Sequence, residues 1–158
     1  MSETFIGKVW VLGDDIDTDI IIPTEYLALK TVEDMKPYAF SPLRPELAGQ
    51  IEKGDIIVAG KNFGCGSSRE QAPEVIQALG IKCIIAKSFA RIFFRNSINN
   101  GLLLIDLKDL RAMLTFASEH AKDYEMEYGR MSSQSISAIL RALIAVEDQG
   151  GDVFFGEP

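Results

Sequence analysis

Short apolar runs, separated by glycine and polar residues, mark the chain up to about residue 105. Runs of this kind, bounded by turn residues, are typical of strands buried in a sheet. They predict strands at residues 5–12, 20–22, 55–60, 81–86 and 102–105. The run at 20–22 consists of isoleucines and stops at Pro23, so we expect a short β-branched strand there.

Apolar residues at helical spacing lie between the later runs. One predicted helix begins near Ala72, because Pro73 is tolerated in the first helical turn, and it ends before Gly80. Another covers residues 89–99 and precedes Gly101. Strands and helices that alternate in this way need crossover connections, which are right-handed and leave the strands parallel. The pattern therefore predicts a mixed α/β fold with a parallel sheet.

The segments outside this alternation are less regular. Thr31 is a good N-cap residue, so a short helix is expected at 31–39, whereas two prolines favour a loop at 41–49. Towards the C-terminus we expect a helix over 107–117, a strand at 124–128 and a helix over 136–144. No change in composition marks a linker, so we expect one domain over residues 1–158.

Composition narrows the possible function classes. The net charge is −7, which argues against nucleic-acid binding, because that function depends on Lys and Arg. No apolar stretch approaches the roughly 18–20 residues of a membrane span, and the first residues do not resemble a signal peptide. We therefore expect a cytoplasmic protein.

Metal-binding side chains are scarce. The chain has two cysteines, Cys65 and Cys83, and one histidine, His120. Two thiols are too few for an iron–sulfur cluster, which usually takes about four thiolates, and one histidine cannot build a His-rich site. The cysteines form no CxxC pair and do not indicate a disulfide framework. We therefore predict no metal site within this chain.

The most informative segment is GKNFGCGSSREQAP, residues 60–73. Its glycines allow tight turns, Ser67 and Ser68 offer hydroxyl groups, and Arg69 offers a planar cation suited to a carboxylate. The spacing fits neither a dinucleotide fingerprint, nor a P-loop, nor a nucleophile elbow. Chemistry alone leaves two interpretations open. The segment is either an anion-binding loop or a glycine-rich turn in which Ser67 caps the next helix through Glu70.

Three segments in this order resemble the swivel domain of the aconitase superfamily: DDIDTDIIIP, the glycine-rich segment, and AKSFARIFFRNSINNGLL. The resemblance is clear over residues 6–105 and weak over 106–158. The chain length matches the free-standing small subunits of 3-isopropylmalate dehydratase and homoaconitase. The resemblance implies a single swivelling β/β/α domain of the aconitase C-terminal type. The sequence departs from a common form at Gln71, where many relatives have histidine.

The resemblance also implies a reaction that two subunits share. Such enzymes move a hydroxyl group between neighbouring carbons of a small di- or tricarboxylate by dehydration and rehydration. A [4Fe-4S] cluster with one open iron acts as the Lewis acid, and its cysteines lie in the large subunit. The chain is thus expected to be the cluster-free small subunit of a hydro-lyase, active only with the large subunit. The two cysteines agree with that expectation.

Carried over position by position, the resemblance assigns roles to four residues. Ser67 matches the serine that removes a proton from carbon, and Ser68 and Arg69 match positions that bind substrate carboxylates. Asp19 matches an aspartate that pairs with a catalytic histidine, which here would belong to the large subunit. A serine is a weak base, so neighbouring N–H groups and Arg69 would have to stabilise its alkoxide.

Substrate choice is expected to depend on residues 24–31, TEYLALKT. Ala28 and Leu29 suit the branched alkyl group of isopropylmalate, although a few buried methyl groups supply only about 1–3 kcal/mol of discrimination. Lys30 could instead reach a distal carboxylate. Isopropylmalate isomerisation in leucine biosynthesis is the favoured activity, with homoaconitase or a citraconate- or dimethylmalate-type dehydratase as alternatives. A non-catalytic binding module with the same fold is the alternative from another class.

Overall fold

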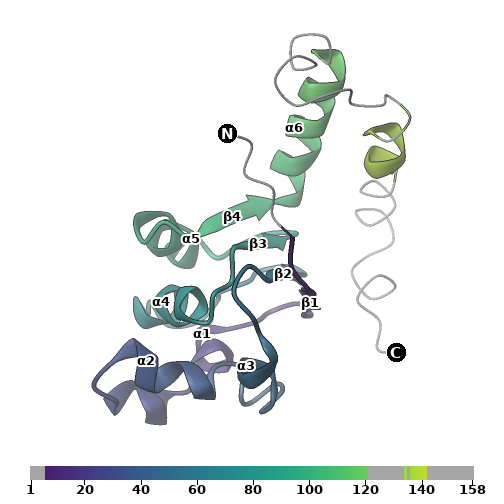
Figure 1. Cartoon of the computed structure of the whole chain (residues 1–158). Helices are drawn as coiled ribbons and strands as arrows, with labels where there is room; N and C mark the ends of the chain where they lie inside the picture. The colour runs from purple at the N-terminus through teal and green to yellow at the C-terminus, as the bar shows by residue number, and fades with distance from the viewer. Residues whose placement is uncertain (1–5, 121–133, 135, 142–158) are drawn as a thin grey trace.

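The computed structural model describes residues 6–120, 134 and 136–141, and Figure 1 shows the course of the chain. Within these residues, four short strands alternate with helices. The strands are β1 (Val9–Val11), β2 (Ile56–Ala59), β3 (Cys83–Ala86) and β4 (Leu103–Asp106). The α-helices are α1 (Thr18–Ile21), α2 (Val32–Met35), α3 (Leu47–Gln50), α4 (Gln71–Ala78), α5 (Arg91–Asn99) and α6 (Leu107–Glu119). The 3-10 helices η1 (Thr24–Ala28) and η2 (Lys36–Tyr38) flank α2.

The strands form one sheet in the order β1-β2-β3-β4, and every neighbouring pair is parallel. Helix α4 connects β2 to β3, and α5 connects β3 to β4. The alternation of apolar runs and helical segments in the sequence produces this parallel sheet, because parallel neighbouring strands need a crossover connection such as a helix. The predicted α/β class with a parallel sheet is therefore confirmed.

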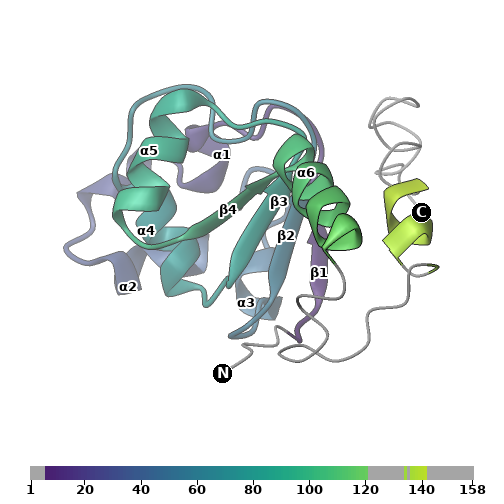
Figure 2. The ribbon, with the colours of Figure 1, turned by 90° about the horizontal axis from the view of Figure 1, so that it is seen from above.

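The two faces of the sheet differ in exposure. Ile57, Ile84 and Leu104 align across neighbouring strands and are at most 7% exposed, because α4 and α5 lie on their face of the sheet (Figure 2). On the opposite face Val9 is 54% and Leu103 is 41% exposed. The described residues thus form one β layer and one helical layer. The second β layer of the implied β/β/α arrangement is not formed by them.

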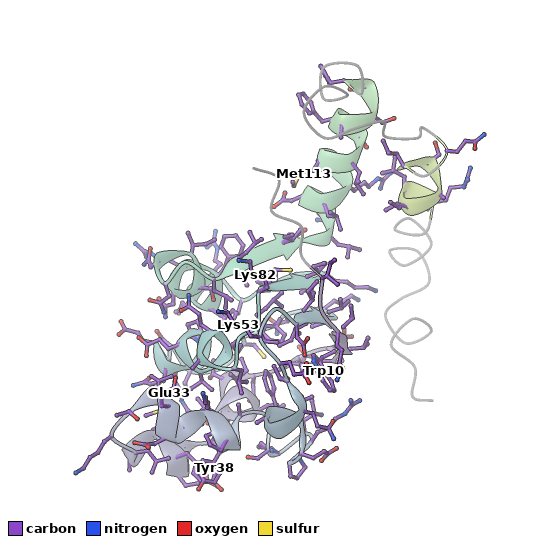
Figure 3. The ribbon with its side chains drawn as sticks, in the orientation of Figure 1. Trp10, Glu33, Tyr38, Lys53, Lys82 and Met113 are labelled. Atoms are coloured by element: carbon purple, nitrogen blue, oxygen red, sulfur yellow. The ribbon has the colours of Figure 1, made fainter. Side chains whose placement is uncertain are left out.

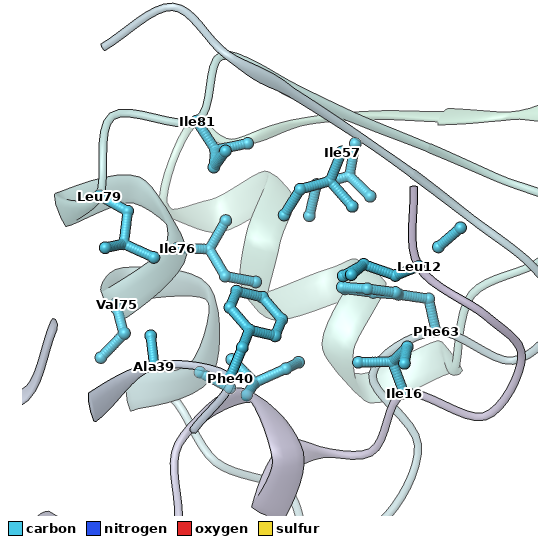
Figure 4. Packing of buried hydrophobic residues seen from close by; sticks show 14 of the residues in the cluster. Leu12, Ile16, Ala39, Phe40, Ile57, Phe63, Val75, Ile76, Leu79 and Ile81 are labelled. Carbon is cyan, nitrogen blue, oxygen red and sulfur yellow. The ribbon is translucent and has the colours of Figure 1, made fainter. Parts of the chain in front are cut away.

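A continuous apolar core lies between the sheet and the helices (Figure 4). Phe40, Phe63 and Ile76 are fully buried in it. The ring of Phe63 meets that of Phe93 edge-on, with centroids 5.4 Å apart and planes inclined by 69°. Because Phe63 belongs to the segment that follows β2, the core anchors the glycine-rich loop at its base.

A buried carboxylate joins β1 to the turn before β2. Asp55 is 3% exposed and accepts hydrogen bonds from Trp10 Nε1 at 2.7 Å and from the backbone N–H groups of Lys8 and Glu52 at 2.9 Å. Trp10 is labelled beside the sheet in Figure 3. Burial alone raises the pKa of Asp55, but these hydrogen bonds and the Lys8 charge outweigh it and lower the pKa below its ordinary value.

The strand predicted at 20–22 is wrong, because α1 takes most of this run. Asp17 is the N-cap of α1, and its carboxylate accepts from Ile20 N at 2.8 Å. Ile21 and Ile22 are both 0% exposed, so consecutive side chains are buried, which an alternating half-buried strand does not allow. The capping bond and this burial favour a helical turn over a strand. The loop predicted at 41–49 is also partly wrong, since α3 begins inside it.

The other predicted elements agree with the structure as far as it describes them. Thr31 caps α2 by accepting from Asp34 N at 3.1 Å, and Gly80 follows α4 with φ of 92°. Helix α6 covers the predicted 107–117. The strand expected at 124–128 lies outside the described residues, as does part of the helix expected at 136–144. Every helix in the described part of the chain falls short of the length and apolarity that a bilayer crossing requires.

Candidate active-site loop

The glycine-rich loop leaves β2 at the carboxyl end of the sheet and leads into α4. Gly64 has φ of 80° and Gly66 has φ of 92°, a region that few residues other than glycine adopt. A Cβ atom on Gly64 would lie 2.1 Å from the Phe93 ring, so the backbone is packed directly on the core. The tight turns predicted from the glycines are present. They hold the loop close to the protein body.

The loop is hydrogen-bonded to the segment that begins α1. Gly64 N donates to Ile16 O at 2.7 Å, and Thr18 N donates to Cys65 O at 2.8 Å. Asp17 and Cys65 form an isolated parallel β-bridge. Two segments far apart in the sequence are therefore fixed side by side, and this pairing brings the predicted site residues of both together.

Ser67 and Ser68 follow the anchored part of the loop and are exposed. The Ser67 carbonyl accepts hydrogen bonds from Thr18 Oγ1 at 3.0 Å and from Arg69 N at 2.8 Å. The N-cap of α4 is Glu70, so the interpretation of Ser67 as the helix cap is wrong. The backbone of Ser67 is thus held in place while the residue stays accessible to a ligand or a partner.

Arg69 joins the loop to α1 and η1. Its Nη1 donates to Ile22 O at 2.9 Å, and its Nη2 donates to Thr24 Oγ1 at 2.9 Å and forms an ion pair with Asp19. Thr24 Oγ1 donates to the same Asp19 carboxylate at 3.1 Å. The structure therefore brings together Arg69 and Asp19, which the sequence reading had given separate roles. The Asp19 side chain is still 55% exposed, so its carboxylate can accept a further donor.

The predicted specificity residues lie in η1 and just after it. Ala28 and Lys30 are exposed, whereas Leu29 is half-buried and packs against the core. Tyr26 stacks on Tyr38, with ring centroids 4.0 Å apart and planes inclined by 6°. This stack fixes η1 against η2. Ala28 and Lys30 are consequently more accessible to a ligand than Leu29 is.

The described residues do not fit a metal centre. No group of three or more His, Cys, Asp or Glu side chains among them could hold a metal ion. Cys65 and Cys83 are both free thiols, and Cys83 is buried in β3. Burial raises the pKa of Cys65, as do the charges of Asp17 and Asp15, and burial raises that of Cys83. Two separate thiols are too few for an iron–sulfur cluster, so the described residues do not fit one.

Two threonines at the site were not predicted from the sequence. Thr18 and Thr24 lie within or beside DDIDTDIIIP, but their hydroxyl partners come from the loop at 67–69. Local sequence carries no signal for such contacts. The Asp14 carboxylate accepts a hydrogen bond from Lys61 N at 2.7 Å, which ties the segment after β1 to the start of the glycine-rich loop.

Residues 24–110 match the model of the aconitase C-terminal domain, a range that includes the whole glycine-rich loop. The chain belongs to the aconitase C-terminal domain family. This confirms the predicted resemblance. A second model, described as helicase HerA-like C-terminal, matches residues 82–158. It overlaps the aconitase match and covers the region, 106–158, over which the aconitase resemblance is weak.

Several members of the aconitase family are close relatives. The chain is 87% identical over 115 residues to the 3-isopropylmalate dehydratase small subunit of Lachnospira eligens, which covers 73% of this chain and 70% of that one. It is 55% identical over 102 residues to the methanogen homoaconitase small subunit of Methanothermobacter thermautotrophicus, which covers 65% and 60%.

A solved structure shares the fold. The crystal structure of a 3-isopropylmalate dehydratase from Methanocaldococcus jannaschii matches with a TM-score of 0.61 and 49% identity. The match covers 62% of this chain and 59% of that one, so the chain spans less than two thirds of the crystallised relative. The aconitase-type fold over the matched part is therefore shared at the level of both sequence and structure.

Proposed function

We propose that this chain is the small subunit of a 3-isopropylmalate dehydratase, which interconverts 2-isopropylmalate and 3-isopropylmalate in leucine biosynthesis. One observation carries the proposal. An exposed Ser67-Ser68 pair stands on an anchored loop in a chain that is 87% identical over 115 residues to a small subunit of that name. The reaction is a dehydration followed by rehydration of the intermediate with the hydroxyl on the neighbouring carbon.

Ser67 is the proposed base. Its alkoxide would take the proton from the substrate carbon, and the same hydroxyl would return a proton in the reverse direction. Three features support the assignment: the residue is exposed, its carbonyl is held by two donors, and α4 begins a few residues later. The positive end of that helix favours an anion near the loop, which offsets part of the cost of ionising a serine.

Ser68 and Arg69 are the proposed carboxylate ligands. Ser68 is exposed and offers a hydroxyl donor. The guanidinium of Arg69 has more N–H donors than its three acceptors use, so it can bind a substrate carboxylate without releasing Asp19. The charge of Asp19 partly offsets that of Arg69, which would moderate the attraction for a dianion.

Asp19 is the proposed link to the large subunit. Its half-exposed carboxylate is already oriented by Thr24 and Arg69, and it would accept a hydrogen bond from a histidine of the partner. Such a bond fixes the imidazole tautomer and raises its basicity. We place the [4Fe-4S] cluster on that large subunit, because the family match and the 3-isopropylmalate dehydratase relatives are consistent with such a cluster. The assembly is proposed to be cytoplasmic.

Ala28, Leu29 and Lys30 are the proposed specificity residues. The exposure of Ala28 suits contact with the alkyl group of isopropylmalate, while Leu29 supports the segment from the core side. Homoaconitase is the second candidate, because Lys30 is exposed and could bind a distal carboxylate, and because one relative carries that name. Assays with isopropylmalate, homoaconitate and citraconate distinguish the candidates, since only one should turn over efficiently.

The direct test is co-expression with a large-subunit gene from the same source, followed by Ser67→Ala in the purified heteromer. Loss of a proton-transfer group typically costs about 10²–10⁴-fold in kcat, and we expect a loss in that range. Ser97→Ala is the matched control, because Ser97 is buried in α5. Near-normal turnover of Ser67→Ala would remove Ser67 as the base. A chain that binds no large subunit and supports no hydratase activity would instead favour the non-catalytic binding module.

A further inference from the structure

We infer that Thr18 is a positioning residue for Ser67, and that its hydroxyl sets the orientation of the proposed base. The inference rests on the proposed function only in taking Ser67 as that base. Thr18 is 1% exposed, although it is polar and lies beside an exposed loop. A buried hydroxyl of this kind needs a partner, and its partner is the Ser67 carbonyl at 3.0 Å.

Thr18 holds the loop on both sides of Gly66. Its backbone N–H donates to Cys65 O at 2.8 Å, and its side chain donates to the carbonyl of Ser67. Gly66 passes close between them, since a Cβ atom there would lie 3.3 Å from Thr18 Oγ1. One residue of α1 thus defines the path of three consecutive loop residues.

The Ser67 carbonyl receives two donors from different segments. Arg69 N reaches it from within the loop at 2.8 Å, and Thr18 Oγ1 reaches it from α1. A carbonyl oxygen has two lone pairs, so both donors can be accommodated. The Arg69 bond lies within the loop, so it does not itself attach the Ser67 carbonyl to α1. The Thr18 bond attaches the Ser67 carbonyl directly to a buried residue of α1 and so holds the backbone that carries the Ser67 side chain.

Helix α1 consequently holds both halves of the proposed site. Thr18 binds Ser67, and its neighbour Asp19 pairs with Arg69. The proposed base and the proposed carboxylate ligand are therefore both held by the same helical turn, whose N-cap is Asp17. A displacement of about 1 Å at a reacting group can cost on the order of 10²-fold in rate. Holding both groups on α1 should therefore affect the rate of catalysis and not substrate binding alone.

A matched set of variants isolates the hydroxyl. Thr18→Val keeps the branched shape and removes the donor, whereas Thr18→Ser keeps the donor and removes the methyl group. The Ser67 carbonyl keeps its bond from Arg69 N in both variants, so no buried acceptor is left unpaired. Thr115→Val serves as the control, because its hydroxyl donates to Arg111 O within α6 and is distant from this loop in the sequence.

Kinetics of the reconstituted heteromer give the first measurement. We expect Thr18→Val to lower kcat by about 10–100-fold with KM changed by less than about three-fold, and Thr18→Ser to restore kcat to within about three-fold. Thr115→Val should match the parent. A Thr18→Val heteromer with parental kcat, or a Thr18→Ser heteromer as impaired as Thr18→Val, would overturn the inference.

Hydrogen exchange in the full chain without its partner gives a second measurement that does not need activity. Thr18→Val should accelerate amide exchange at residues 66–69 by about ten-fold or more and leave α4 and α5 unchanged, while Thr18→Ser should exchange like the parent. Rapid exchange across α4 and α5 would assign Thr18 to the fold as a whole and overturn the inference. If the parental heteromer has no dehydratase activity, the proposed function fails, and the exchange data still decide whether the hydroxyl orders the loop.

Discussion

Asn in place of Asp55 tests the buried carboxylate that joins β1 to the turn before β2. The two carboxylate oxygens accept three hydrogen bonds: Oδ2 from Trp10 Nε1 and Glu52 N, and Oδ1 from Lys8 N. Asparagine has one acceptor oxygen. At best it keeps the two bonds of Oδ2, now without charge, and turns its NH₂ group towards the Lys8 N–H.

The magnitude follows from that count. A hydrogen bond to a charged group contributes about 1.5–3 kcal/mol, and one such bond is lost outright while two are weakened. Lys8 and Glu52 are exposed, so water can accept hydrogen bonds from their backbone N–H groups. The loss of stability therefore stays near the middle of that range. We expect Asp55→Asn to lower the free energy of unfolding by about 2–3 kcal/mol. At a urea m-value of about 1–3 kcal/mol/M, the midpoint should fall by about 0.7–3 M.

The assay is urea unfolding at several pH values, followed by circular dichroism and by the fluorescence of Trp10, the only tryptophan. The folded-state pKa of Asp55 is lowered, so its stabilisation is fully present above the unfolded value of 3.8 and is lost as pH falls through the lower folded value. The difference in unfolding free energy between the parent and Asp55→Asn should therefore stay constant down to about pH 5 and shrink below about pH 4.

Two results would refute this reasoning. One is a midpoint for Asp55→Asn that equals the parental midpoint at pH 7. The other is a stability gap that stays constant down to about pH 2, because the carboxylate would then contribute without titrating. Asp109→Asn is the matched control. Asp109 is exposed in the first turn of α6, so its replacement should cost no more than about 0.5 kcal/mol.

Three further predictions concern the loop and its support. Gly64→Ala should destabilise the chain by about 2 kcal/mol or more in urea unfolding, because the added methyl group would lie 2.1 Å from a core ring and the backbone there has φ of 80°. Gly49→Ala is the control and should be neutral or stabilising, because a Cβ atom at Gly49 meets nothing within 4 Å. Ser97→Ala should raise the unfolding free energy by about 0.5–1 kcal/mol, because the buried Ser97 hydroxyl has no hydrogen-bond partner among the described residues; a loss of stability would contradict this. Alkylation of Cys65 by iodoacetamide, followed by mass spectrometry, should be slower at pH 8 than that of an unstructured cysteine, because burial and the charges of Asp17 and Asp15 raise the Cys65 pKa. It should be faster in Asp15→Asn, and equal rates in the parent and Asp15→Asn would exclude the contribution of the Asp15 charge.

Local patterns predicted the fold best where two independent signals agreed. The runs at 55–60 and 81–86 are mostly apolar, interrupted only by Asp55 at the start of the first and Lys82 in the second, and a helical segment closed by Gly80 separates them. The spacing of apolar residues and the positions of glycine and proline all favoured the same two strands and the helix between them. The run at 20–22 had only β-branched composition in its favour, and the cap at Asp17 and complete burial of two successive isoleucines produced a helix.

Sequence by itself predicted the α/β class and the parallel sheet, and its motifs carried the resemblance to the family. The resemblance in turn proposed the candidate residues Ser67, Ser68, Arg69 and Asp19, which stay predictions. The class and the sheet follow from the periodicity of apolar residues and the family follows from the motifs, which are all properties of neighbouring residues. Tertiary structure alone decided that Arg69 pairs with Asp19, that Thr18 holds the Ser67 carbonyl, and that Val9 and Leu103 on the edge strands stay exposed. The physical reason is that these contacts join segments far apart in the chain. Their donors and acceptors become partners only after the core has fixed the loop against α1.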